Sequence, residues 1–169
     1  MAIGLSSGSR ISRVDYDQTR EVLAAFEREG VDYVVFGGVA MNLQGLPRAT
    51  EDLDVFVAPT GDNIRRLRKA LASVFTDPHI EEITATDLLG NYPAIQYVPP
   101  DGGFHLDILT RLGEAFRVED LKSERVDFDG LEVSVVTADM LYRMKKDTVG
   151  PRDRGDADRL RRRLDLEGE

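Results

Sequence analysis

The sequence predicts an α+β fold, in which a mixed, twisted β-sheet carries helices mainly on one of its faces. Two observations support this fold class. Helical and strand patterns alternate in the first half of the chain, strand patterns dominate the middle, and two helical patterns close the sequence. The 169 residues are 41% hydrophobic and 31% charged, which is a globular balance with enough apolar material for one core.

The first half of the chain begins with a helix and a strand. Apolar side chains at helical spacing predict a helix over residues 15–29, which ends at Gly30. A mostly apolar run with three valines predicts a buried strand over 31–36. The other elements expected in this half are a short helix over 39–44, a strand over 53–58, and a helix that starts after Thr60.

The second half is richer in strands. Residues 94–98 and 104–109 have strand composition and flank a loop with strong turn chemistry at 99–103. Asp129-Gly130 is the best short hairpin signal in the chain. The other elements expected here are a turn or short helix over 87–90, hairpin strands over 125–128 and 131–136, a helix between Thr137 and Pro151, and a polar helix over 153–166.

The composition of the chain excludes some classes of function and disfavours others. Residues 1–13 are rich in Ser and Gly and are expected to form a flexible tail, which leaves 14–169 as one domain. The absence of Cys excludes disulfides and thiolate metal sites. Without a membrane-length apolar run or a secretory pattern, a soluble cytoplasmic protein is expected. The net charge of −9 argues against broad, non-specific binding of nucleic acid.

The most informative stretch is Asp52-Leu53-Asp54, which follows Gly37-Gly38 after thirteen residues. Two carboxylates two positions apart on a strand point to the same face, with their Cα atoms roughly 6.5–7 Å apart. That spacing lets them share metal ions held about 3.5–4 Å apart, an arrangement suited to phosphoryl displacement. The Gly-Gly pair lets the backbone approach a phosphate without interference from a Cβ atom. The bland alternatives are solvated acids before a strand and a plain tight turn.

A third carboxylate is expected from Asp107, which lies in an otherwise apolar strand pattern. A lone Asp in such a strand is costly to bury unless it is paired or binds a metal, although an exposed edge-strand position is the alternative. Oxygen ligands of this kind favour Mg²⁺ or Mn²⁺ over zinc. His105 shares the face of Asp107 by alternation, and we interpret it as structural or as a support for the metal ligands.

Gly-Gly, Asp-x-Asp and a later strand Asp together resemble the nucleotidyltransferase fold of the DNA polymerase beta superfamily. The strings GGVAMNLQGLPRATEDLDVFV, HLDILTRLGEAF and VVTADMLYRMKKD, with RDRGDADRL after the last of them, resemble its small prokaryotic stand-alone branch, including the AbiEii-type toxin group. The resemblance spans residues 31–160.

The resemblance implies roles for particular residues. Gly37 and Gly38 match the motif that contacts the phosphates of the incoming nucleotide, although relatives often have Ser at the second position. Asp52 and Asp54 match the metal-binding pair, and Asp107 matches the third carboxylate, which orients or deprotonates the attacking hydroxyl.

Further positions carry weaker expectations. Lys145 resembles a helix lysine near the triphosphate, with an ordinary surface lysine as the alternative. Arg48 and Thr50 either contact the nucleotide or shape the preceding loop. Asp153 and Asp156 resemble a late acidic motif, and we interpret them as caps or salt-bridge partners.

The resemblance implies transfer of a nucleoside monophosphate from an NTP, such as ATP, to an acceptor hydroxyl, with Mg²⁺ as cofactor. Three hypotheses follow. The protein is a toxin that modifies tRNA or another cellular target beside an antitoxin, a small-molecule (antibiotic-type) nucleotidyltransferase, or a non-catalytic nucleotide- or partner-binding module. A small acceptor would bind in the cleft of a homodimer or beside the C-terminal helices, and no membrane partner is expected.

Overall fold

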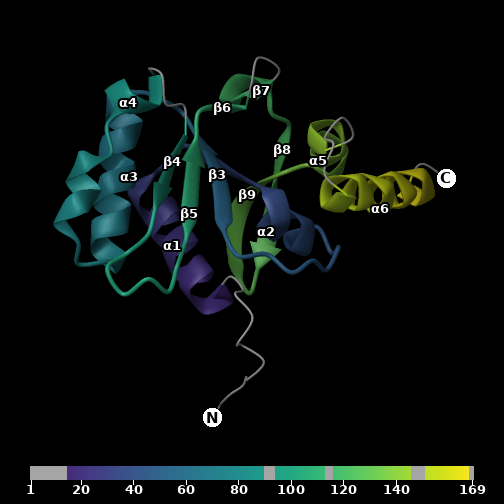
Figure 1. Ribbon diagram of the computed structural model, residues 1–169, viewed down its shortest axis with the longest axis horizontal. Helices are drawn as coiled ribbons and strands as arrows, with labels where there is room; N and C mark the ends of the chain where they lie inside the picture. The colour runs from purple at the N-terminus through teal and green to yellow at the C-terminus, as the bar shows by residue number, and fades with distance from the viewer. Residues whose placement is uncertain (1–14, 90–93, 113–115, 146–150, 168–169) are drawn as a thin grey trace, which may run out of the picture.

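A six-stranded sheet forms the centre of the molecule (Figure 1). The computed structural model describes residues 15–89, 94–112, 116–145 and 151–167, so the predicted tail over 1–13 lies outside the described residues. The strands follow the spatial order β4-β5-β3-β2-β9-β8. Their bounds are β2 Tyr33–Phe36, β3 Leu53–Val57, β4 Ala94–Tyr97, β5 Leu106–Leu109, β8 Ser123–Phe128 and β9 Leu131–Val136.

The sheet is mixed, as the sequence predicts. β2 runs antiparallel to β3 and parallel to β9, while β3 runs parallel to β5. The edge strands β4 and β8 are antiparallel to their neighbours. The β8–β9 hairpin turns at Asp129 (φ 50°) and Gly130 (φ 87°), which confirms the predicted turn, because two consecutive positive φ angles suit a two-residue hairpin loop.

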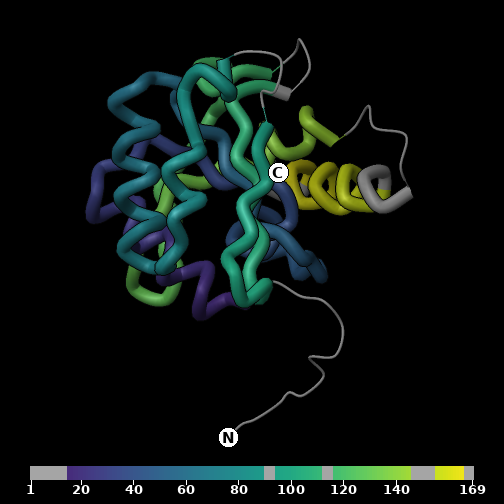
Figure 2. Tube along the Cα trace, turned by 60° about the vertical axis from the view of Figure 1, so that its left-hand side comes forward, coloured from purple at the N-terminus to yellow at the C-terminus, as the bar shows by residue number. Residues whose placement is uncertain are grey.

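Two long helices, α1 (Tyr16–Glu29) and α3 (Gly61–Val74), contact each other on one face of the sheet (Figures 1 and 2). Asp15 caps α1 by accepting a hydrogen bond from the Gln18 backbone, and the left-handed Gly30 ends it. Thr60 caps α3 in the same way. The predicted starts of both helices are therefore confirmed by their caps.

Three other helices border the opposite face, and Figure 2 shows the C-terminal helix across the strands from α3. They are α2 (Gly37–Leu43), α5 (Ala138–Lys145) and α6 (Pro151–Glu167). α6 contacts α5, and α5 contacts α2. Pro151 is the first residue of α6, a position where its missing N–H costs nothing. The remaining elements are α4 (Ala85–Leu89), the short strands β6 (Arg111–Leu112) and β7 (Phe116–Arg117), and the 3₁₀ turns Pro78–Glu82 and Val118–Asp120.

The core lies mainly between the sheet and the α1–α3 pair. Phe26 of α1 and Leu67 of α3 are fully buried, as are Val35, Val55 and Ile108 on the central strands. Each buried side chain of this size contributes about 1.5–3 kcal/mol through apolar burial. This packing holds the central strands in one register, and that register positions the site described next.

Within the described residues, no helix combines the length and apolar character that crossing a membrane requires.

Candidate active site

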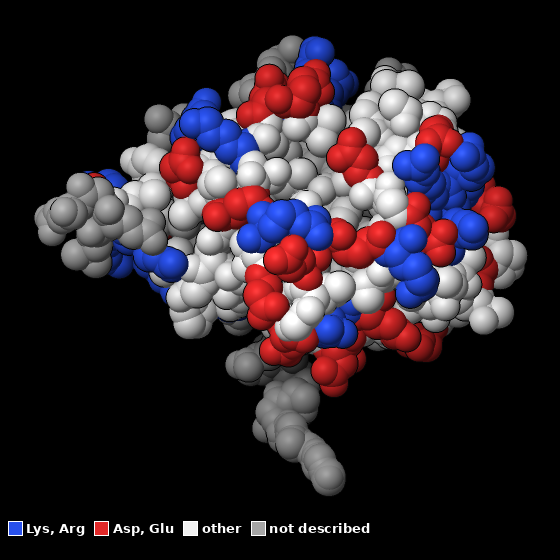
Figure 3. Space-filling model, turned by 180° about the vertical axis from the view of Figure 1, so that it is seen from behind, with Lys and Arg blue, Asp and Glu red and all other residues white. Residues whose placement is uncertain are grey.

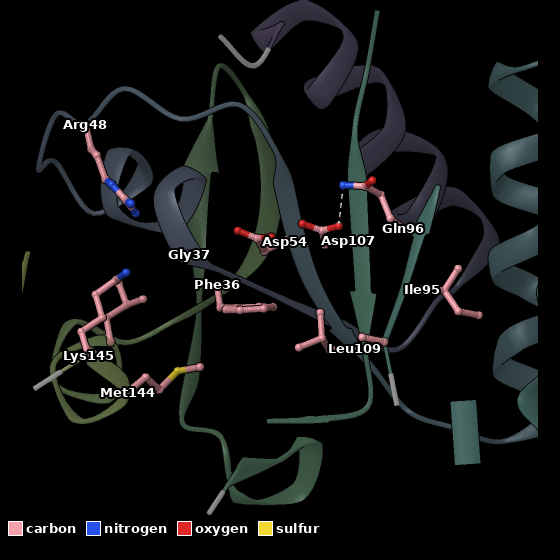
Figure 4. A pocket seen from close by; sticks show the side chains of 12 residues that line it. Phe36, Gly37, Arg48, Asp54, Ile95, Gln96, Asp107, Leu109, Met144 and Lys145 are labelled. Atoms are coloured by element: carbon pink, nitrogen blue, oxygen red, sulfur yellow. Dashed lines mark hydrogen bonds between the residues drawn. The ribbon is translucent and has the colours of Figure 1, made fainter. Parts of the chain in front are cut away.

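One cross-strand row of side chains defines the site. Phe36 of β2 lies opposite Asp54 of β3, Asp54 lies opposite Asp107 of β5, and Asp107 lies opposite Gln96 of β4. Side chains opposite each other in a sheet project from the same face. The row therefore runs across four adjacent strands on the face away from α1 and α3 (Figure 4).

Asp52, two residues before Asp54, completes a cluster of three carboxylates. One oxygen from each of Asp52, Asp54 and Asp107 lies within 4.8 Å of the others, and all three residues are half-buried. The sequence-predicted trio is therefore brought together. Three anionic oxygen donors at this spacing suit the hard cations Mg²⁺ and Mn²⁺.

Two members of the cluster, Asp52 and Asp54, have raised pKa values. Burial, a hydrogen bond to Asp107 and the charges of Asp107 and Asp52 raise the pKa of Asp54 to about 8, against the opposing effect of Lys145. Burial and the neighbouring Asp107 carboxylate also raise the pKa of Asp52. Carboxylates held together in this way favour a proton or a cation between them. The donor set thus fits a divalent metal in both chemistry and charge.

His105 and Gln96 each contact one carboxylate of the cluster. The Nδ1 atom of His105 lies 3.3 Å from Oδ1 of Asp52. The Nε2 atom of Gln96 donates to Oδ1 of Asp107 over 3.2 Å. Each contact restrains the orientation of one carboxylate, which is how the partners of metal ligands usually act.

Gly37 is required by the position of Asp54. Its φ of +70° lies in the left-handed region, and a Cβ atom added there would lie 2.1 Å from Oδ2 of Asp54. Any larger residue would displace the carboxylate or the backbone. The structure therefore explains why the first helical residue of α2 is a glycine.

Gly38 is fixed by a different neighbour. A Cβ atom at Gly38 would lie 2.6 Å from both Cβ and Oγ1 of Thr50. The Thr50 hydroxyl donates to the backbone oxygen of Asp52 over 3.3 Å. Thr50 thus fills the space that a serine side chain at position 38 would need, and it holds the loop that leads into the Asp52–Asp54 pair.

A cavity of about 720 Å³ opens beside the row (Figure 4). Asp54 and Asp107 face it near its middle, and Arg48 and Lys145 lie together at one end. Asp52 and Thr50 are outside the described lining. The lining residues are Phe36, Gly37, Arg48, Asp54, Ala94, Ile95, Gln96, Asp107, Leu109, Leu141, Met144 and Lys145.

Asp156 of α6 joins the two cationic side chains of the cavity. Its Oδ2 atom lies 3.2 Å from Nη1 of Arg48 and 3.4 Å from Nζ of Lys145. The three side chains are only 14%, 12% and 6% exposed, for Arg48, Lys145 and Asp156 respectively. Among the described atoms, Nε of Arg48 and Oδ2 of Asp156 are buried without a hydrogen-bond partner. Ion pairing alone therefore leaves part of this group unsatisfied. Asp153 lies in α6 too, but its side chain is outside the described residues.

Asn42 holds the Arg48 loop in place. Its Oδ1 atom accepts from the Arg48 backbone N–H and its Nδ2 atom donates to the Arg48 carbonyl, both over 2.8 Å. The same Nδ2 also donates to the Gly38 carbonyl. Asn42 thus hydrogen-bonds both the N–H and the carbonyl of Arg48 and links α2 to this loop. The loop is held where the Arg48 side chain reaches Asp156.

Sequence reasoning did not single out Asn42 or Gln96 for the site, and it treated Asp156 only as a salt-bridge candidate. No spacing motif marks these positions. Alternation does place Gln96 and Ala94 on one face of their strand, but only the register with β5 brings Gln96 to Asp107.

Comparison with solved structures supports the fold. The chain resembles the lincosamide antibiotic adenylyltransferase LnuA in its lincomycin-bound form, with a TM-score of 0.59, 13% identity, and coverage of 88% of this chain and 98% of that one. It resembles ANT(2")-Ia in complex with adenylyl-2"-tobramycin with a TM-score of 0.52, 14% identity and 86% coverage of each chain. The Thermotoga maritima protein TM1012 gives a TM-score of 0.53 at 14% identity, over 94% of this chain and 99% of that one.

No curated protein sequence matches the chain. A family profile does match, however, over residues 21–161, and its description is "Nucleotidyl transferase AbiEii toxin, Type IV TA system". The matched range contains every residue of the cavity described above. The chain therefore belongs to the AbiEii nucleotidyltransferase family.

Proposed function

We propose that this enzyme moves a nucleoside monophosphate from an NTP to an acceptor hydroxyl in a Mg²⁺-dependent reaction, with Mn²⁺ as a substitute. The observation that carries the proposal is the cavity itself. Asp54 and Asp107, with Asp52 beside them, face a space whose far end holds Arg48 and Lys145. Such a site offers ligands for a cation and positive charge for a triphosphate at once.

Asp52, Asp54 and Asp107 would hold a divalent metal, which would supply positive charge to neutralise the triphosphate. The missing Cβ atoms of Gly37 and Gly38 leave room for Asp54 and Thr50, and the backbone N–H groups of this pair are the groups offered to the phosphates. Arg48 and Lys145 bind the phosphates that leave as pyrophosphate. Asp107, oriented by Gln96, accepts the proton of the attacking hydroxyl. The protein contributes mainly position and charge, as is usual for phosphoryl transfer.

Membership of the AbiEii family favours a role as the toxin of a toxin–antitoxin pair. In that role the chain would act in the cytoplasm on a cellular target and would be controlled by an antitoxin partner. The labelled product formed from each NTP in a cell extract would identify both the nucleobase and the target.

A second candidate role is the modification of a small molecule. Two of the structural relatives are an antibiotic adenylyltransferase with lincomycin bound and an enzyme in complex with adenylylated tobramycin. Their likeness to this chain concerns the fold. It favours a small acceptor only in combination with features of this chain's own cavity.

Asp54→Asn should abolish Mg²⁺-dependent NTP consumption and transfer, by about a thousandfold or more, because it removes a charged ligand from the centre of the row. Turnover with labelled NTP measures the loss, and circular dichroism checks the fold. Glu51→Gln, at an exposed position outside the trio, is the matched control. Unchanged turnover in Asp54→Asn would refute the catalytic assignment and favour a non-catalytic binding module.

The metal-free protein should lose stability as the pH rises from about 4 to about 8. Asp54 has a pKa of about 8 in the folded chain and an ordinary value of 3.8, so the folded state binds the extra proton across this window. Its contribution is complete at the acidic end and is lost as the pH passes 8. Asp54→Asn should make the decline shallower and raise the melting temperature at pH 8 by several degrees. Thermal melts in a chelator test this, and equal slopes for both proteins would contradict it.

Lys145→Ala should weaken binding of an NTP about tenfold or more, since a buried cation at the triphosphate end is lost. Isothermal titration with a non-hydrolysable NTP and Mg²⁺ measures the change. Lys69→Ala, a change at an exposed lysine on α3, is the control and should leave affinity unaltered. An unaltered affinity in Lys145→Ala would show that Lys145 pairs with Asp156 without contributing to nucleotide binding.

Asp156→Asn should destabilise the nucleotide-free protein by about 1–3 kcal/mol, because two nearly buried cations lose neutralising charge. A bound triphosphate brings negative charge of its own, so the thermal shift produced by Mg²⁺ and NTP should be larger than in the unaltered protein. Asp158→Asn, at an exposed position on the same helix, is the control. A loss of stability that nucleotide fails to offset would show that Asp156 has no relation to the phosphate end.

A further inference from the structure

The two ends of the cavity differ in charge, and this difference indicates which substrate lies where. Arg48 and Lys145 occupy one end, the Asp54–Asp107 carboxylates lie between, and strand β4 forms the other end (Figure 4). We propose that the acceptor binds over Ala94 and Gln96 of β4, and that it is a small hydroxyl compound without phosphate groups, neutral or cationic. This inference rests on the function proposed above and names its acceptor.

The direction of the reaction assigns the ends. In phosphoryl transfer the attacking and leaving oxygens lie roughly in line through phosphorus. With the leaving pyrophosphate at Arg48 and Lys145, the attacking hydroxyl must approach from the opposite side. That side is the one where Asp107 and Gln96 stand at neighbouring register positions. The acceptor O–P bond forms as the bond from the α-phosphorus to the bridging oxygen breaks, and the hydroxyl proton passes to the Asp107 carboxylate.

Strand β4 leaves this end open. It is the edge strand of the sheet, and Ala94 and Gln96 are both exposed. By alternation both belong to the face of Asp107 and Leu109, whereas Figure 4 shows Ile95 directed away from the carboxylates. The wall at this end therefore consists of the Gln96 amide, the Ala94 methyl group and the apolar side chains of Ile95 and Leu109, none of which carries a charge.

The wider charge pattern opposes a nucleic-acid acceptor. Between Lys69 and Arg111 the sequence contains no Lys or Arg over 41 residues, while it contains six Asp and Glu and both histidines of the chain. This stretch supplies β4, β5 and the connections around them. A phosphodiester chain that passed over β4 would find no permanent positive charge from the stretch that forms this end, although phosphate contacts provide most nucleic-acid affinity.

One other face of the molecule is mixed in charge (Figure 3). On the face seen in Figure 3, Lys and Arg side chains are interspersed with Asp and Glu, without a continuous basic band. At the phosphate end, Arg48 and Lys145 already face the buried Asp156. A neutral acceptor meets no repulsion on the β4 side, and a cationic one is attracted to the carboxylates.

The test follows label from each α-labelled NTP, with Mg²⁺ and the full chain, into a cell extract divided by ultrafiltration. Tobramycin and lincomycin serve as added cationic probes and deacylated tRNA as the nucleic-acid probe. We expect label in a low-molecular-weight compound that resists ribonuclease.

Ala94→Arg should then raise the KM for that acceptor about tenfold or more, with the Kd for NTP unchanged. Val98→Arg, at an exposed position just after β4 and outside the described lining, should leave both constants unchanged.

The outcomes separate the two proposals. Label in tRNA, in other RNA or in protein would overturn the acceptor assignment and leave nucleotidyl transfer standing. An unchanged acceptor KM in both Ala94→Arg and Gln96→Arg would also overturn the acceptor assignment and leave nucleotidyl transfer standing. The second variant is included because a local folding defect could affect the first. No labelled product from any NTP, with NTP still bound in titrations, would overturn transfer itself and the acceptor assignment with it.

Discussion

The repulsion among three carboxylates is the constraint on which the rest of the site depends. Asp54 and Asp107 lie opposite each other on parallel strands, and Asp52, which directly precedes β3, brings a carboxylate oxygen within 4.8 Å of theirs. No local preference would hold these charges together, because burial and the neighbouring carboxylates raise the pKa of both Asp52 and Asp54. The register of a buried sheet does so at the expense of stability, a common feature of functional sites. Gly37 then allows the start of α2 to approach Asp54 closely.

At the other end of the cavity, two positive charges rather than three negative ones are held close together. Arg48 and Lys145 come from a loop and from the last residue of α5, and both are mostly buried. Asp156 lies between them and Asn42 fixes the Arg48 backbone, so the cations are already in position for the triphosphate that we propose they bind. A site prepared in this way loses less freedom when it binds its substrate. The unsatisfied atoms of Arg48 and Asp156 mark where that preparation is incomplete.

How far the sequence predicts this site depends on the range of the interactions. The pairing of Asp52 with Asp54 follows from period-two alternation, and the cap at Thr60 follows from local turn chemistry. The partnership of Asp54 with Asp107 needs a register between distant strands, which single-strand patterns do not specify. Gln96, Asn42 and Asp156 act through contacts 4 to 108 positions away, and no spacing motif identifies them.

The positions in the row differ in how strongly the sheet constrains them. Phe36, Asp54 and Asp107 lie on strands paired on both sides, where a change of size or register disturbs the core. Gln96 and Ala94 lie on the edge strand, exposed and paired on one side only. A substitution of Ala94 alters the wall of the cavity without removing a contact of the carboxylates, whereas a substitution of Gln96 also removes a hydrogen bond to Asp107. A fold that keeps one nucleotide site while accepting different acceptors would therefore place the difference on β4, where this chain presents an uncharged surface.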